Sequence, residues 1–224
     1  MNEGGPSLLS RNLWTKRTTR FLAILEHALQ LLASQTGLES AEVELNRRLY
    51  WCLLEASRSL HPAEECAPSP ECNNQPDPDD TVRARREAKR PDFQWMFLDR
   101  YESDPHRSSR QFVVECKRLG MPPRADWILN ANYVEHGIWR FVAPEWSYAK
   151  RFASAAMVGY WQSMEGNEVL QEVNAAAKKR GITVVELRSE GWQAGKVIKL
   201  EHNLERSFPA SLFLLRHYWV DIRT

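Results

Sequence analysis

Two short stretches decide the fold: Arg90-Pro91-Asp92-Phe93 and, further along the chain, Phe112-Val113-Val114-Glu115-Cys116-Lys117. Each has the apolar, β-branched or aromatic character of a strand. Alternate side chains of a strand share one face, so Glu115 and Lys117 project together while the apolar residues between and before them point into a core. We therefore expect one acid and one lysine on a strand, with a second acid, Asp92, at the start of a neighbouring strand.

This combination of side chains predicts a site for a divalent cation and a phosphate. Two carboxylates brought together repel each other unless a cation lies between them. Mg²⁺ takes oxygen ligands and is usually held by one or two protein carboxylates together with phosphate oxygens, and Mn²⁺ could replace it. Lys117 would supply a compact charge and a donor to the phosphate or to the attacking water. The alternative is that Asp92 lies in a turn after a proline and that Glu115 and Lys117 form a solvated strand face.

The order of elements around these stretches predicts an α/β fold, with a mixed central β-sheet flanked by helices. Apolar periodicity and capping residues predict helices at about 18–35 and 41–60, the first capped by Thr18 or Thr19 and the second by Ser40. The remaining elements that we expect are strands at 93–101 and 110–118, helices at 126–141, 147–164 and 167–180, and strands at 182–188, 193–200 and 210–222.

The chain of 224 residues is predicted to form one domain in three parts. Residues 1–60 would be helices packed on the core, 61–90 a flexible loop, and 91–224 the core that carries the site. The loop is rich in proline, has six acids and no base over residues 62–80, and then has five bases and one acid over 83–90. So much charge and so little apolar surface do not offset the entropy cost of ordering.

Composition limits the classes of protein to consider. Lys plus Arg is 30 and Asp plus Glu is 29, so the formal net charge of +1 excludes a globally basic nucleic-acid-binding surface. The longest apolar run is far shorter than the roughly 18 residues of a membrane span, and the first residues do not resemble a secretory signal. The four cysteines show no paired CxxC spacing. We expect a protein of the reducing cytoplasm with no membrane partner.

The motif Pro91-Asp92, followed by Glu115-Cys116-Lys117, resembles that of the PD-(D/E)XK nuclease superfamily, which has the restriction-endonuclease-like fold. The resemblance implies a magnesium-dependent phosphodiesterase that acts on DNA. In that pattern a helix before the first core strand often supplies another acid, and Glu44 is the candidate here, as a third catalytic and metal-binding residue. Glu44 would equally suit the first turn of a helix, where an acid interacts favourably with the helix dipole.

Four further residues are candidates for binding nucleic acid. Tyr133 and Arg140 lie on one face of the predicted helix 126–141, where Gly137 would allow a strand to approach closely. Arg86 and Lys89 belong to the basic run before Asp92. The alternatives are a half-buried Tyr133, a surface ion pair for Arg140, and a solvated linker for the basic run.

The segments 133–141 and 156–160 also resemble a block found in restriction-endonuclease-like proteins of bacterial anti-phage defence. The chain lacks a GxxxxGK[ST] nucleotide-binding loop, so any gating by nucleotide hydrolysis requires another polypeptide. We therefore expect control by a protein partner, such as an ATPase or sensor subunit, or by homo-oligomerisation. A binding or scaffold subunit without cleavage and an RNase toxin remain alternatives, and the sequence does not separate DNA from RNA.

Aromatic and basic residues elsewhere have two interpretations. His202, Arg206 and His217 could contact phosphate or assist a proton transfer, but such groups are more often structural. Trp95 and Trp127 could stack on bases, although packing in the core is the expectation for both.

Overall fold

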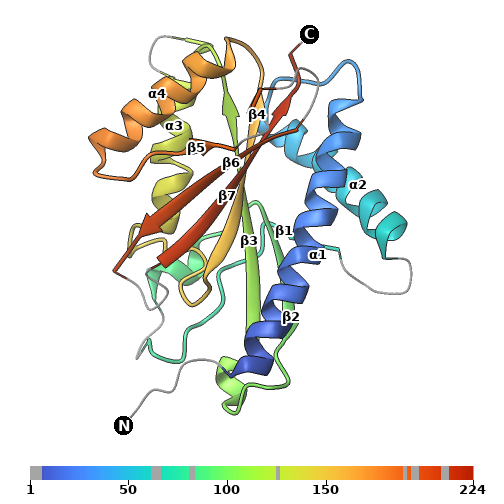
Figure 1. The fold of residues 1–224 in the computed structure, drawn as a ribbon, viewed down its shortest axis with the longest axis vertical. Coiled ribbons are helices and arrows are strands. Elements are labelled where there is room, and N and C mark those ends of the chain that lie inside the picture. The colour runs from blue at the N-terminus through green and yellow to red at the C-terminus, as the bar shows by residue number, and fades with distance from the viewer. Residues whose placement is uncertain are drawn as a thin grey trace.

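Seven strands form one mixed β-sheet in the computed structural model of the protein, which describes residues 7–61, 67–80, 84–124, 127–188, 191–192, 197–207 and 212–223. The strand order across the sheet is β1-β2-β3-β4-β7-β6-β5. The strands are β1 Ser69–Pro70, β2 Phe93–Leu98, β3 Ser109–Leu119, β4 Ser154–Trp161, β5 Glu186–Leu187, β6 Val197–Glu205 and β7 Leu212–Asp221. Helices flank this sheet (Figure 1), so the predicted α/β class with a mixed central sheet is confirmed.

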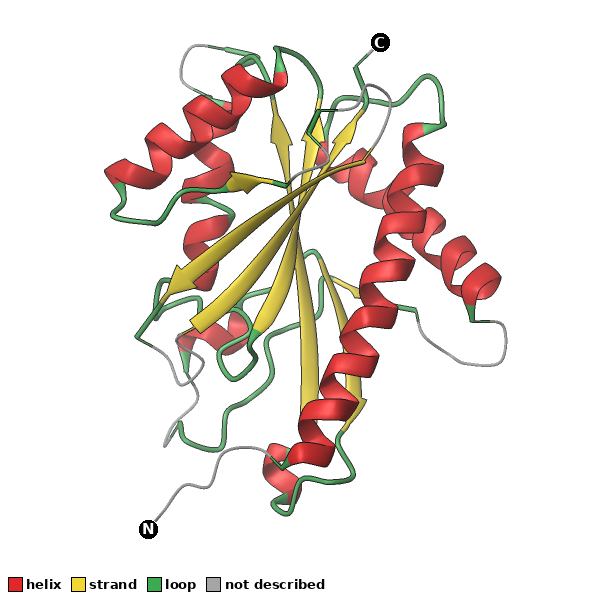
Figure 2. Ribbon diagram, in the orientation of Figure 1, coloured by secondary structure: helices red, strands yellow, loops and turns green. Residues whose placement is uncertain are grey.

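Two pairs of helices cover the two faces of the sheet (Figures 1 and 2). Helices α1 (Leu8–Ala33) and α2 (Glu42–Leu60) pack on the face that presents Phe112, Val114 and Cys116. Helices α3 (Leu129–Glu135) and α4 (Gly166–Lys179) pack on the opposite face, and a 3₁₀ turn, η3 (Ile138–Phe141), follows α3. Cys116 is fully buried, as its place in the strand pattern predicted. None of the helices in the described ranges is both long and apolar enough to cross a membrane.

The centre of the sheet is parallel, because β3, β4 and β7 pair in parallel while β2 and β6 join them antiparallel. Every residue of β4 is buried. A parallel strand covered on both faces has a continuous apolar sequence without alternation. The predicted helix at 147–164 was wrong for this reason. The small residues of β4 make room for neighbours: a Cβ on Gly159 would lie 2.7 Å from Trp219 Cδ1.

The N-terminal helices start differently from the prediction. Helix α1 begins at Leu8, and the Ser7 side chain caps it by accepting from the Ser10 N–H. Thr18 instead lies in mid-helix and donates to the Trp14 carbonyl. The N-cap of α2 is Ala41, without a side-chain cap, so the expected caps at Thr18 and Ser40 were wrong. Local capping signals recur along a chain, and tertiary packing decides which one is used.

The proline-rich segment before the site packs against the sheet over its described residues, 67–80 and 84–90. Asp77 is buried and forms ion pairs with Lys150 at 3.0 Å and Arg151 at 3.1 Å. Arg86 is also buried, in an ion pair with Asp80 at 2.9 Å. Asp77 and Asp80 are therefore paired with bases of the same segment and of residues 150–151, and a fully solvated loop does not describe these residues.

A pair of histidines is buried between the sheet and α3. His217 Nδ1 lies 2.7 Å from the Tyr133 hydroxyl, and His202 Nε2 lies 2.9 Å from Thr183 Oγ1. The two imidazole rings are 5.6 Å apart between centroids. Burial lowers the pKa of His202 to about 4 and places the pKa of His217 well below its usual value. Both histidines are therefore neutral, structural groups near pH 7.

These two residues make one contribution to the pH dependence of stability, and a substitution isolates it. Their pKa values are depressed on folding, so the unfolded chain binds protons more tightly between about pH 6.5 and pH 4. The part of the free energy of unfolding that the two histidines contribute should be fully present above about pH 6.5 and should fall as the pH decreases. Urea unfolding at pH 7.5, 6.0 and 5.0 measures this slope. His202→Gln should flatten the slope, and the exposed control His106→Gln should not; equal slopes for both variants would contradict the assignment.

Candidate functional site

Strand β3 continues beyond the N-terminal end of β2, so one edge of β3 has no strand partner from β2 after Val114. Strand β2 pairs with β3 in the register Phe93 to Val114, and continuing this register would place Pro91 opposite Cys116. Proline has no N–H to donate to a ladder, so regular pairing stops here. The Asp92 side chain replaces the missing strand partner: its Oδ2 accepts a hydrogen bond from the Cys116 N–H at 2.7 Å. Pro91 and Asp92 thus set the point at which β2 begins, and Asp92 places a carboxylate beside β3.

The structure brings Asp92, Glu115 and Lys117 together, as the motif predicted. Lys117 Nζ lies 2.9 Å from Glu115 Oε1 and 3.9 Å from Asp92 Oδ2. Both carboxylates therefore lie within 4 Å of one ammonium nitrogen. Lys117 Nζ also donates to the Cys116 carbonyl at 2.6 Å. The Lys117 side chain thus links Asp92 before β2 with the two acceptors of β3.

Helix α2 supplies the third acid, but from Glu42 and not from Glu44. Glu42 Oε1 lies 2.8 Å from Lys117 Nζ. Glu44 forms an ion pair with Arg47 at 3.6 Å on the helix surface. Residues two apart in an α-helix point about 200° apart around the axis, so only one of these acids can face the site. Glu42 therefore lies where Glu44 was expected, and a catalytic or metal-binding role for an acid of α2 stays a prediction.

Asn46 lies one helical turn after Glu42 and orients Asp92. Its Nδ2 donates to Asp92 Oδ1 at 3.0 Å, and its Oδ1 accepts from the Tyr160 hydroxyl of β4 at 2.8 Å. Asp92 therefore has a hydrogen bond on each oxygen. Neither Asn46 nor Tyr160 was among the residues predicted for the site. The i, i+4 spacing of Glu42 and Asn46 was a usable signal for a shared helix face, whereas the approach of Tyr160 depends on strand order.

Arg140 reaches the site from η3. Its Nη1 is in direct contact with Glu115 Oε1, and its guanidinium lies 4.4 Å from the centre of the Trp146 ring. The predicted alternative, a surface ion pair, is wrong, since the partner carboxylate is fully buried. Arg140 thus joins the site as a cation on Glu115, although it was proposed as a backbone contact for nucleic acid.

Burial dominates the electrostatics of these groups. Burial and then the Asp92 carboxylate raise the pKa of Glu115 to about 8, against the effects of Lys117 and Arg140. Burial also raises the pKa of Asp92, and Lys117 opposes that shift. Burial alone would lower the pKa of Lys117, but the three carboxylates around it raise its pKa. The lysine therefore stays charged, and the anionic forms of the two acids depend on the cations that they contact.

The acids around Lys117 offer only oxygen donors. Glu42, Asp92 and Glu115 offer carboxylate oxygens, the ligand type that Mg²⁺ and Mn²⁺ prefer. Glu115 Oε2 is buried and has no hydrogen-bond partner within the described residues. Three carboxylates face two cations, Lys117 and Arg140, which leaves a formal charge of 2 − 3 = −1. The unsatisfied oxygen suits a bound cation, and so does the negative charge that is left when all three acids are ionised.

The three carboxylates of the site already contact cations of the protein itself, Lys117 and Arg140. In the described part of the chain, no three His, Cys, Asp or Glu side chains are grouped so that they could hold a metal ion. Lys117 and Arg140 contact Glu115 Oε1, an oxygen that an ion would use. Binding of Mg²⁺ by Asp92, Glu115 and Glu42 would therefore require at least one of these cations to move.

Three of the proposed nucleic-acid contacts have other roles or stay untested. Tyr133 is fully buried, with its hydroxyl 2.7 Å from His217 Nδ1 and 3.1 Å from Trp219 Nε1, so it does not face a ligand. Arg86 is buried in ion pairs, which also removes it from a binding surface. Lys89 lies 4.2 Å over the Trp146 ring, the same ring that Arg140 contacts, so it borders the site. Its contact with nucleic acid stays a prediction.

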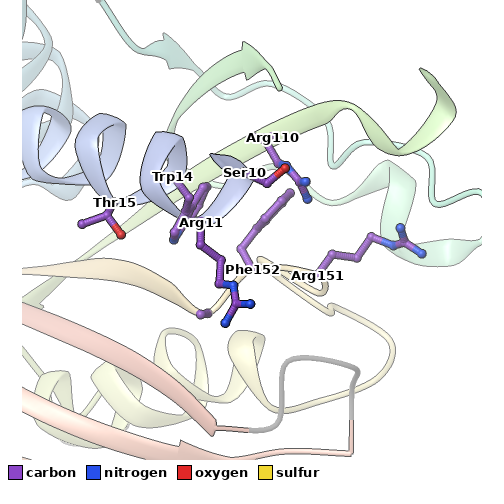
Figure 3. Close-up of a pocket in the computed structure, with 8 residues that line it drawn as sticks. Ser10, Arg11, Trp14, Thr15, Arg110, Arg151 and Phe152 are labelled. Carbon is purple, nitrogen blue, oxygen red and sulfur yellow. The ribbon is translucent and has the colours of Figure 1, made fainter. Parts of the chain in front are cut away.

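Two cavities are candidates for a ligand. One, of about 250 Å³, adjoins the acids and is lined by Glu42, Lys117, Arg118, Trp127, Leu129, Asn132, His136 and Arg140. The other, of about 340 Å³, lies where the N-terminal ends of α1 and β3 meet (Figure 3). In the second cavity Trp14 stacks on Phe152, and Arg110 and Arg151 already pair with acids. Only the first cavity combines a ligand-sized space with the predicted motif.

Gly137 keeps α3 close to Lys117. A Cβ at this position would lie 2.4 Å from the Tyr133 carbonyl oxygen, 2.5 Å from Met157 Cε and 3.3 Å from Lys117 Cγ. The space that was expected to admit a nucleic-acid strand is therefore filled by the protein itself. Gly137 sets how closely η3, with Arg140, approaches β3.

Gly137→Ala should lower the free energy of unfolding by about 1–3 kcal/mol, because the backbone carbonyl of Tyr133 cannot move without disturbing α3. Urea unfolding followed by circular dichroism measures this loss. Gly181→Ala is the control, since a Cβ there meets nothing within 4 Å and only the positive φ of 68° is unfavourable. A smaller loss for Gly137→Ala than for Gly181→Ala would contradict the packing described here.

Comparison with known proteins leaves the motif and the geometry as the grounds for assigning a function. No family model, no curated protein and no solved structure matches this chain.

Proposed function

We propose that the protein is a nuclease of the PD-(D/E)XK type, which hydrolyses phosphodiester bonds of DNA with Mg²⁺ or Mn²⁺. The observation that carries the proposal is the convergence of Glu42, Asp92 and Glu115 on the Lys117 ammonium, beside a cavity. Three elements supply these groups: α2, the segment before β2, and β3. The mixed sheet flanked by helices is compatible with a restriction-endonuclease-like fold.

Each group has a role that its position supports. Asp92 and Glu115, with Glu42, would hold the ion, and Asn46 would keep Asp92 oriented through Asp92 Oδ1. A bound divalent ion would lower the pKa of water and offset charge that develops on the phosphate. Lys117 is within reach of all three acids, so its ammonium would donate to the attacking water or to a non-bridging phosphate oxygen. Arg140 would leave Glu115 and pair with the phosphate.

One observation favours a second function, a nucleic-acid-binding or scaffold subunit without cleavage. Lys117 and Arg140 both contact Glu115, and a carboxylate neutralised by two cations has less need of a metal. In that case the ion pairs would be structural, and loss of Lys117 would leave the biological phenotype unchanged.

Control by another molecule completes the proposal. Lys117 and Arg140 contact the acids of the site, so a nuclease of this kind would require a signal that moves at least one of these cations before a metal ion binds. We propose a protein partner, such as an ATPase or sensor subunit, or a homo-oligomer, acting in cytoplasmic anti-phage defence. The support is the absence of a nucleotide-binding loop from the sequence and the resemblance of segments 133–141 and 156–160 to defence proteins.

Cleavage should require the metal and the motif lysine. Supercoiled plasmid, linear duplex, single-stranded DNA and RNA are incubated with the protein in EDTA, Mg²⁺ and Mn²⁺. Asp92→Asn and Lys117→Ala should each reduce the cleavage rate by about 10²–10⁴-fold, because one removes a ligand charge and the other a donor. The exposed control Lys178→Ala should not. Metal-independent cleavage would contradict the proposal, preference for RNA would favour a toxin, and rapid cleavage by the chain alone would contradict control by a partner.

Two acids of α2 provide a matched test of the corrected site. Glu42→Ala should lower the cleavage rate at least about tenfold, since it removes one of three carboxylates around Lys117. Glu44→Ala should keep the activity, because Glu44 pairs with Arg47 on the surface. Initial rates at several Mg²⁺ concentrations separate weaker metal binding from slower chemistry. A larger effect at Glu44 would show that the helix is rotated relative to this structure.

A further inference from the structure

More cations than carboxylates line the cavity beside Lys117, although the chain as a whole is nearly neutral. Its lining includes three permanent cations, Lys117, Arg118 and Arg140, and one carboxylate, Glu42. Lys117 and Arg140 already contact acids of the site. Arg118 donates to the Ser40 carbonyl at 3.3 Å and, among the described residues, forms no ion pair with a carboxylate. The cavity therefore keeps a cation available for an anionic ligand such as a phosphate.

Trp127 gives the same cavity an aromatic wall. The residue lies just before α3 and keeps 41% of its surface exposed, whereas Trp95 is 2% exposed in the core. Packing was the expectation for both tryptophans, and it holds for Trp95 only. An exposed indole beside cations is the arrangement on which an unpaired base stacks in single-strand-binding proteins.

Asn132 adds an unsatisfied donor. Its side chain lines the cavity, and its Nδ2 is buried without a hydrogen-bond partner in the part of the chain that the structure describes. Leaving such a donor unpaired is unfavourable. A ligand that brings an acceptor, such as a base carbonyl or ring nitrogen, would satisfy it. A cation, an indole face and an amide donor are the three groups that recognise a phosphate, the face of a base and the edge of a base.

The cavity is small and has room for about one nucleotide. Its volume of about 250 Å³ is below the roughly 300–1,000 Å³ of pockets that enclose drug-sized molecules. A base inside a duplex is also stacked on both faces, so it cannot stack on Trp127 without leaving the helix.

We infer that the nuclease binds an unpaired nucleotide in this cavity, with its phosphate at Arg118 and Lys117 and its base on Trp127. The substrate class is therefore single-stranded or locally unpaired nucleic acid, and intact duplex is a poor ligand. This inference rests on the proposed function, and it adds the substrate class to it.

The test measures binding in EDTA, where cleavage is absent, at one low salt concentration. Fluorescence anisotropy compares a labelled single-stranded DNA oligonucleotide, the same sequence as RNA, the blunt duplex, and a duplex with one unpaired nucleotide. The single strand and the duplex with the unpaired nucleotide should bind at least about tenfold more tightly than the blunt duplex. Tighter binding of the DNA or of the RNA strand identifies the source of the nucleotide.

Variants of the residues that line the cavity test whether the cavity causes the preference for single strands over the blunt duplex. Trp127→Ala should weaken single-strand binding by about tenfold and leave blunt-duplex binding within twofold, while Trp127→Phe should retain most of the affinity because a ring remains. Asn132→Ala should weaken single-strand binding several-fold. Trp51→Ala is the matched control, since Trp51 is 56% exposed on α2 and does not line the cavity. Circular dichroism spectra and melting temperatures confirm that each variant is folded.

Two outcomes would overturn the inference: equal or tighter binding of the blunt duplex, or equal effects of Trp127→Ala and Trp51→Ala. Failure of the proposed nuclease is a separate result. If single-strand binding depends on Trp127 but cleavage does not depend on metal and Lys117, the cavity assignment stands and the nuclease assignment fails. If cleavage depends on Lys117 but strand preference does not depend on Trp127, the reverse holds.

Discussion

The Lys117 ammonium is the interaction on which the site depends. It lies within 4 Å of carboxylates from three separate parts of the chain, at Glu42, Asp92 and Glu115. Bringing three acids into a buried volume without a cation would be strongly unfavourable, because each would be desolvated and would repel the others. A single flexible side chain with a compact charge can approach all three, whereas a planar guanidinium would favour one bidentate partner.

The backbone around β2 and β3 creates the space in which Lys117 lies. Regular pairing of β2 with β3 stops at Pro91, and the Asp92 carboxylate accepts from the buried Cys116 N–H. The free edge of β3 admits the start of α2, which brings Glu42 and Asn46. The site therefore lies where an antiparallel strand stops beside a parallel pair, β3 and β4, near the carboxyl ends of those strands. Openings of this kind in α/β sheets are common places for ligands to bind.

The charge balance of the chain is local. Acids of the proline-rich segment pair with Lys150 and Arg151, far along the sequence, and with Arg86 of the same segment, and these bases are thereby removed from any binding surface. The cavity at the site keeps an excess of cations. A nearly neutral protein can thus present Arg118, a cation without an ion pair among the described residues, at this cavity, because interactions between exposed charges are screened within about a Debye length.

Sequence by itself determined the α/β class, the approximate positions of α2, β2, β3 and α4, and the grouping of Asp92, Glu115 and Lys117. These features follow from local rules: strand alternation, helical periodicity, and the inability of proline to continue a ladder. The tertiary structure alone decided that 154–161 is a buried parallel strand, because burial on both faces removes the alternation that identifies a strand. It also decided that Glu42 and not Glu44 meets the site, and that Tyr133 packs inward while Trp127 faces the cavity. Those choices depend on the rotation of each helix about its axis against the sheet, and that rotation is set by long-range packing that a local pattern does not contain.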